Sequence, residues 1–129
     1  MAGRRGRGGG GTWIQLLILK VLYETPLHGY RLIDEVNKLL KGRRPIKPGS
    51  MYTILRRMEK SGLLSSEWDK ESSRIERRVY QLTEAGLERL KNGRLMVAGQ
   101  KKIIDEMTVF YKNHLPESEA DDGNKSNPG

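Results

Sequence analysis

Residues 48–64 read PGSMYTILRRMEKSGLL and carry the clearest structural signal in this chain of 129 residues. Four apolar residues recur there at three- and four-residue steps and predict one buried helix face: Met51, Ile54, Leu55 and Met58. Ser50 is the predicted N-cap of this helix, and Gly62 is the predicted stop. The other positions are mostly polar or basic, so the pattern predicts a short helix that packs one face on a core and leaves the other free for a partner.

Two more helices are predicted before this one. Residues 13–23, WIQLLILKVLY, are apolar nearly all round, which favours a buried helix that ends at Pro26. Residues 28–40 carry apolar side chains on one face only, which predicts an amphipathic helix that ends before Pro45. Three short helices joined by tight turns predict a compact tri-helical core.

A β-hairpin and a long terminal helix are predicted after this core. Residues 63–68 and 75–82 have strand character and flank a polar turn. The last helix is predicted to run unbroken from Thr83 to about Asn113. Its apolar residues follow a seven-residue spacing: Leu90, Val97, Ile104 and Tyr111, then Met96, Ile103 and Phe110 one position earlier, and Met107. One small domain cannot cover such a seam, which favours a second copy as the partner; the alternative is a helix that folds back on its own core.

The positive charge of the chain is concentrated in one segment. The formal net charge is +8, and residues 41–60 contain seven Lys and Arg side chains against the single acidic residue Glu59. A concentrated basic stretch suits a polyphosphate partner, whereas the alternative is a solvated basic face with no partner.

Catalysis and metal binding are not expected. The chain has no cysteine and only two histidines, His28 and His114, and no cluster of His, Cys or paired carboxylates marks a pocket. We therefore predict that the protein is not an enzyme and has neither a metal site nor a cofactor.

The order of these elements predicts a winged helix-turn-helix, mainly α with a small β-hairpin. The major groove of DNA is about 12 Å wide and admits one helix, so the third helix should enter it with the hairpin, or wing, alongside. The side chains predicted to contact double-stranded DNA are His28, Tyr30, Lys47, Ser50, Tyr52, Thr53, Arg56, Arg57, Arg74, Arg77 and Arg78. Four of them have a second interpretation: Tyr52 at the edge of the core, Arg57 in an ion pair with Glu59, Asp69 or Glu71, Arg78 against the strand face, and His28 as a helix cap.

The sequence divides into four predicted parts. They are a disordered Gly/Arg arm at 1–12, a DNA-binding domain at 13–82, a C-terminal dimerisation helix at 83–115 and a disordered acidic tail at 116–129. The apolar run at 13–23 is shorter than the roughly 20 residues needed to cross a bilayer, and no signal-peptide cleavage site follows it. We therefore expect a cytoplasmic protein without membrane contact.

Three blocks of the sequence resemble the PadR family of transcriptional regulators. They are LYETPLHGYRL at 22–32, GSMYTILRRMEKSGLL at 49–64 and RRVYQLTEAG at 77–86. The resemblance implies a winged-helix homodimer that binds a pseudo-palindromic operator and usually represses transcription. Two features depart from the family pattern: the wing tip at 71–77, ESSRIER, lacks the glycine-arginine-proline tip, and the last helix has no tryptophan for a flat ligand.

The resemblance also implies dimerisation through the first and last helices. The predicted interface residues are Trp13, Leu17, Leu90, Val97, Ile103, Ile104, Met107, Phe110 and Tyr111. A small hydrophobic effector at the dimer centre would be lined by Met96, Val97, Met107 and Trp13; the alternative is that these four side chains are dimer core. Two other functions stay open at this stage, a non-specific architectural DNA-binding protein and a winged-helix module for protein interaction.

Overall fold

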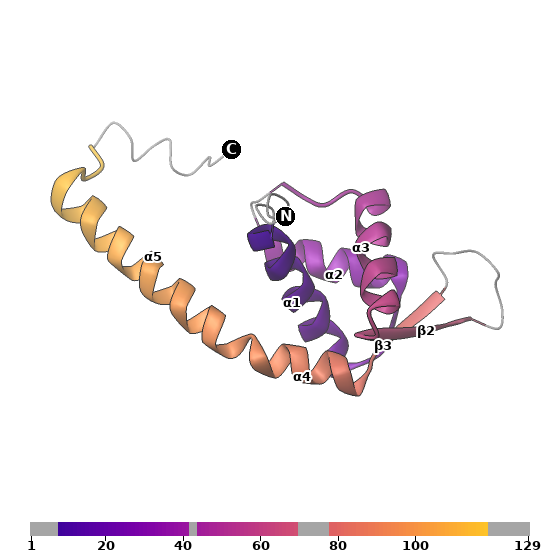
Figure 1. The fold of residues 1–129 in the computed structure, drawn as a ribbon. Helices are drawn as coiled ribbons and strands as arrows, with labels where there is room; N and C mark the ends of the chain where they lie inside the picture. The colour runs from indigo at the N-terminus through magenta and orange to yellow at the C-terminus, as the bar shows by residue number, and fades with distance from the viewer. Residues whose placement is uncertain (1–7, 42–43, 70–77, 119–129) are drawn as a thin grey trace. The chain divides into compact units, whose positions relative to one another are not determined.

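The computed structural model describes residues 8–41, 44–69 and 78–118. The elements, in chain order, are α1 (Gly8–Glu24), β1 (Leu27–His28), α2 (Gly29–Leu40), α3 (Pro48–Lys60), β2 (Leu64–Trp68), β3 (Arg78–Leu82), α4 (Glu84–Asn92) and α5 (Arg94–His114) (Figure 1). The predicted class, mainly helical with a small antiparallel sheet, is confirmed. The chain divides into two compact units, residues 1–91 and 92–129.

The core of the first unit is built from the inner faces of three helices and the sheet. Its buried side chains are Leu16, Ile18, Leu19 and Leu22 of α1, Leu32, Ile33 and Val36 of α2, Met51, Leu55 and Met58 of α3, and Leu63, Leu64 and Tyr80. In α2 and α3 these residues follow three- and four-residue steps, so each helix buries one stripe. Burial of one stripe leaves the opposite face of α3 exposed.

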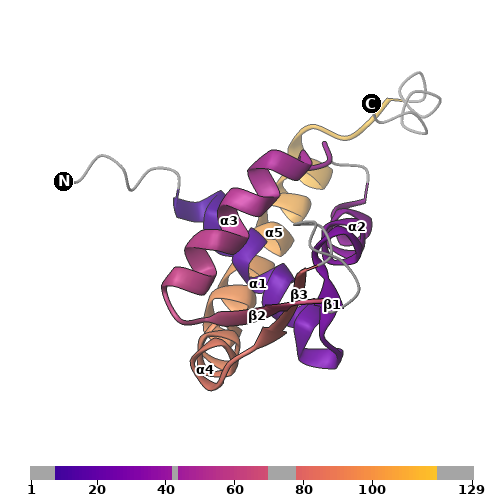
Figure 2. The ribbon, with the colours of Figure 1, turned by 90° about the vertical axis from the view of Figure 1, so that its right-hand side faces the viewer.

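The sheet has three antiparallel strands in the order β1-β3-β2 (Figure 2). In the β2–β3 pair, Leu64 lies opposite Leu82 and Trp68 lies opposite Arg78. The sequence predicted only the two strands of the hairpin and missed β1, in which Leu27 pairs with Tyr80. A strand of two residues is too short to show the apolar–polar alternation from which strands are predicted.

Three predicted element boundaries were wrong. The first helix begins at Gly8 and not at Trp13; intrinsic propensity, which disfavours glycine in a helix, is only a weak preference that context overrides. The third helix has Lys47 as its N-cap and Pro48 at its first position, where no backbone N–H is needed, so Ser50 is not the cap. The last helix is interrupted at Gly93, where α4 ends and α5 begins; glycine weakens a helix by about 1 kcal/mol relative to alanine.

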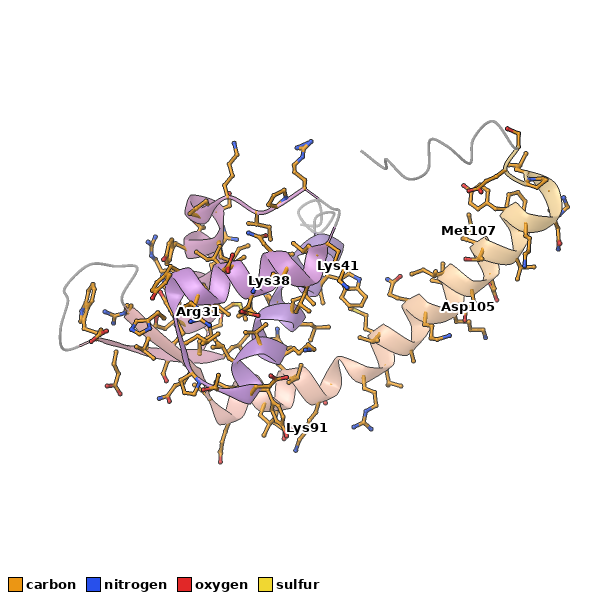
Figure 3. All side chains as sticks on the ribbon, turned by 180° about the vertical axis from the view of Figure 1, so that it is seen from behind. Arg31, Lys38, Lys41, Lys91, Asp105 and Met107 are labelled. Atoms are coloured by element: carbon orange, nitrogen blue, oxygen red, sulfur yellow. The ribbon has the colours of Figure 1, made fainter. Side chains whose placement is uncertain are left out.

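The second unit contains α5, none of whose residues is buried. Its apolar side chains are 43–60 % exposed at Val97, Ile103, Ile104, Met107, Phe110 and Tyr111. On the opposite side from Met107, Asp105 accepts a hydrogen bond of 2.8 Å from Lys101 (Figure 3). The helix is therefore amphipathic, with an exposed apolar stripe of the kind that packs on another protein surface. Within the described ranges, none of the helices has the length and hydropathy to cross a bilayer.

Candidate nucleic-acid interface

The exposed face of α3 carries most of the polar side chains that were predicted to contact DNA. Lys47, Ser50, Thr53, Arg56 and Arg57 are all exposed. Within the described residues, Arg57 forms no ion pair with Glu59 or Asp69, and Glu71 lies outside them. The face therefore presents two arginines side by side, ahead of Lys60 in the last turn.

The N-terminal end of α3 combines a lysine with helix amides. Lys47 is the extended residue before the helix, and its carbonyl accepts the first helical hydrogen bond, 3.0 Å from the Met51 nitrogen. The hydroxyl of Thr53 donates to the Gly49 carbonyl at 3.1 Å, so its oxygen keeps lone pairs for an outside donor. The positive end of a helix dipole attracts phosphate, and Lys47 adds a full charge there.

Tyr52 is only partly exposed, in line with its alternative interpretation as a residue at the edge of the core, but that interpretation placed its hydroxyl at the surface, which was wrong. Its hydroxyl oxygen is buried, and its ring lies against Gly29 at the start of α2. A Cβ on Gly29 would come within 2.9 Å of the Tyr52 ring. The hydroxyl is thus turned toward α2, and a contact of Tyr52 with DNA stays a prediction.

His28 links the start of α2 to the end of β2. It is the N-cap residue of α2, as its second interpretation had it, although its side chain makes no capping hydrogen bond. Its Nε2 lies 2.9 Å from Oδ2 of Asp69, and its ring lies 5.7 Å from the ring of the exposed Tyr30. Contacts of His28 and Tyr30 with phosphate stay predictions.

Arg78 is half-buried and takes part in a chain of contacts between the sheet and α3. Its Nε donates to Oγ of Ser66 at 2.7 Å, and this hydroxyl donates to Oε2 of Glu59 at 2.8 Å. The guanidinium also lies 4.6 Å from the centre of the Trp68 ring. Arg78 therefore lies against the strand face, its alternative interpretation. The other two wing arginines that were predicted to contact DNA, Arg74 and Arg77, lie outside the described residues.

This chain of contacts was not predicted from the sequence. Ser66 lies outside the three quoted blocks, Glu59 was considered only as a partner of Arg57, and the pairing of β2 with β3 is what brings Ser66 to Arg78. The chain also shapes the electrostatics around Tyr80. Burial raises the pKa of the Tyr80 hydroxyl, the Glu59 carboxylate raises it further, and the Arg78 and Arg56 charges oppose the rise.

The residues predicted for the dimer interface are all accessible. Trp13 and Leu17 of α1 and Leu90 of α4 are partly exposed, and the predicted residues of α5 form its exposed stripe. A pocket of about 320 Å³ lies at the sheet between Pro26, Trp68 and Val79. Its lining includes none of the side chains that were predicted to contact an effector. In the part of the chain that the structure describes, no three His, Asp or Glu side chains are placed to hold a metal ion.

Comparison with known proteins gives a consistent result. Residues 18–92 match the model of the transcriptional regulator PadR-like family. A PadR family transcription regulator of Clostridium difficile is 28 % identical with a TM-score of 0.62, over 74 % of this chain and 98 % of that one. A candidate transcriptional regulator of Thermoplasma acidophilum is 31 % identical with a TM-score of 0.65, over 77 % of this chain and 93 % of that one.

A curated relative is longer than this chain. The transcriptional regulator YqjI of Escherichia coli K12 is 29 % identical over 102 residues, which cover 74 % of this chain and 47 % of YqjI. The chain therefore spans about half the length of this relative.

Proposed function

The chain belongs to the PadR-like family of transcriptional regulators, a family of regulators and not of enzymes, and from this premise we propose that it is a homodimeric, sequence-specific repressor. Two copies bind a pseudo-palindromic operator, with α3 of each copy in a major groove and the wing alongside. The observation that carries this proposal is the exposed face of α3, where Ser50 and Thr53 offer short polar groups beside Arg56 and Arg57. Short groups and arginines are the side chains that read base edges and phosphates.

The homodimer is supported by the apolar stripe of α5. Side chains of this stripe such as Ile104, Met107 and Tyr111 are about half exposed. Packing the stripe on a second copy of itself removes apolar surface from water, which is favourable. A two-fold dimer presents two α3 helices to a duplex, which requires an operator with matching symmetry. A small hydrophobic effector at the dimer centre and a cytoplasmic location stay predictions.

Selection of bound sequences from a random DNA pool tests the proposal. We expect a symmetric motif whose half-sites lie about one helical turn, or roughly 10 base pairs, apart. In competition, the selected site should be preferred over random duplex by at least about a thousandfold. Tight binding without preference would instead indicate an architectural DNA-binding protein, and absence of any mobility shift at modest salt would indicate a module for protein interaction.

The dimer is tested by Ile104→Glu, which places a charge in the apolar stripe of α5. We expect light scattering to give the mass of one chain for this variant and of two chains for the wild type, because burial of an unpaired carboxylate is strongly unfavourable. The monomeric variant should also bind the operator less tightly than the wild type does. Lys101→Gln, beside Asp105 on the polar side, is the control and should remain dimeric. A dimeric Ile104→Glu variant would show that the stripe is not the interface.

A further inference from the structure

The side chain of Asn37, on α2, holds the backbone of a residue that lies nine positions later. Its Oδ1 accepts a hydrogen bond of 2.9 Å from the Ile46 nitrogen, and its Nδ2 donates one of 3.2 Å to the Ile46 carbonyl. The backbone N–H and C=O of Ile46 are thus both bound by the partly buried side-chain amide of Asn37. Arg31 and Lys38 of α2 and its C-cap residue Lys41 are exposed (Figure 3), whereas Asn37 is only partly exposed.

Ile46 lies two residues before Pro48, the first residue of α3. The next residue, Lys47, is extended with φ −70° and ψ 149°, and Pro48 follows at the first helical position. Proline has a fixed φ and restricts the residue before it, so few torsions between Ile46 and the helix are free to change. The position of the Ile46 peptide is therefore transmitted to the first turn of α3, where the Lys47 carbonyl accepts from the Met51 nitrogen.

The end of α2 is strained where the connection to α3 begins. Lys41 ends α2 with a φ of 33°, which a lysine adopts only under strain, so the helix end alone does not favour this path. The two hydrogen bonds from Asn37 instead hold the chain at Ile46, since one binds its backbone N–H and the other its carbonyl.

We propose that Asn37 is a positioning residue for DNA recognition. It does not touch DNA; it fixes the N-terminal end of α3 so that Lys47, Ser50 and Thr53 meet their groove contacts. This inference rests on the proposed function of α3 as the groove helix. Hydrogen bonds to base edges weaken steeply with small displacements, whereas attraction to phosphates does not. Loss of these two hydrogen bonds from Asn37 therefore lowers specific binding more than non-specific binding.

The first experiment compares full-length variants on the selected operator and on random duplex. For Asn37→Ala we expect operator affinity to decrease by roughly tenfold or more and random-duplex affinity by less than about threefold, in line with the loss of base readout. Asn37→Asp keeps an acceptor for the Ile46 nitrogen but places a carboxylate oxygen against the Ile46 carbonyl oxygen, so it should not restore the discrimination that Asn37→Ala loses. Equal losses on both duplexes in Asn37→Ala would overturn the proposal.

A matched control comes from a second two-bond side chain. The Thr83 hydroxyl donates to the Gly62 carbonyl at 2.7 Å and accepts from the Gly86 nitrogen at 3.0 Å. Thr83→Val removes two hydrogen bonds, as Asn37→Ala does, but at the start of α4. We expect it to keep the wild-type ratio of operator to random affinity. An equal fall of that ratio in both variants would show a general effect of destabilisation and would overturn the assignment.

Amide hydrogen exchange tests the positioning without DNA. In Asn37→Ala the amides of Ile46 and Met51 should exchange at least about tenfold faster, while that of Leu55 in the middle of α3 is unchanged, because only the helix start is released. Unchanged exchange at Ile46 and Met51 would overturn the proposal. If the wild-type protein shows no operator preference, the proposed function fails, and the exchange rates alone then decide whether Asn37 positions α3.

Discussion

The Nε of Arg78 donates a hydrogen bond of 2.7 Å to the Oγ of Ser66 on the neighbouring strand. Direct cross-strand partners are Ser66 with Tyr80 and Arg78 with Trp68, so the bond runs diagonally across the β2–β3 pair. Because Ser66 also donates to Glu59 at 2.8 Å, the bond connects the last turn of α3 to the base of the wing. The two parts of the protein that are proposed to meet DNA are thus joined by one chain of side chains.

Arg78→Lys should destabilise the fold although it keeps the charge. Lysine has no group at the Nε position to donate to Ser66 and does not stack on Trp68 as a planar guanidinium does. We expect the free energy of unfolding in urea to fall by about 1–2 kcal/mol. Arg57→Lys, at an exposed position, is the control and should leave it unchanged. Equal stability of the two variants would show that the Arg78 contacts contribute nothing.

Gly29→Ala should destabilise the first unit through Tyr52. The new Cβ would lie 2.9 Å from Cε1 and 3.0 Å from the hydroxyl oxygen of Tyr52, so the ring must move. Such overpacking costs about 1–3 kcal/mol in the free energy of unfolding. Gly49→Ala is the matched control, because no atom lies within 4 Å of its Cβ, and it should stabilise α3 by about 0.5–1 kcal/mol.

A double-mutant cycle isolates the Gly29 contact. Combined with Tyr52→Ala, the Gly29→Ala substitution should cost less than it does alone, since the ring it meets has been removed. Additive costs in thermal and urea unfolding would show that the two residues are not coupled.

The helices α2 and α3 were predictable because each buries one stripe. The steps of Leu32, Ile33 and Val36, and those of Met51, Leu55 and Met58, are local properties that survive in any helix packed on a core. The strand β1 and the break at Gly93 were not predictable. A two-residue strand exists only because β3 lies beside it, and a glycine inside a helical pattern does not itself show whether the helix continues.

The candidate interface was predictable as a face and not as a set of contacts. The pattern of α3 separates exposed from buried positions, so Arg56 and Arg57 were placed correctly on the exposed side. The partners of His28 and Arg78 depend on residues 41 and 12 positions away, Asp69 and Ser66, which only the sheet register brings close. Asn37 was missed because its partner, Ile46, lies nine positions later and beyond the end of α2, where no sequence pattern indicates the contact.

Stability should decrease at alkaline pH because of Tyr80. Burial raises the pKa of its hydroxyl above that of a tyrosine in the unfolded chain, which is about 10. Above that pH the unfolded chain releases a proton that the folded chain retains, so the free energy of unfolding falls as pH rises toward the higher, folded-state pKa. Below pH about 10 the contribution is fully present. Tyr80→Phe should flatten this slope in urea titrations between pH 9 and pH 11, roughly the range that brackets a tyrosine pKa. The exposed Tyr23→Phe is the control and should keep the wild-type slope.

Arg56→Ala and Arg57→Ala should weaken operator binding without changing the dimer. If the arginine contacts a phosphate, its replacement should lower the affinity for all sequences and reduce the slope of log affinity against log salt by about one. If the arginine reads a guanine, its replacement should instead cost about 1–3 kcal/mol of binding free energy and relax the sequence preference at one position. Lys38→Ala is the control, because it removes the same charge from α2, outside the face of α3. Fluorescence anisotropy over a series of salt concentrations distinguishes the two roles. Wild-type affinity in both arginine variants would contradict the placement of α3 in the major groove.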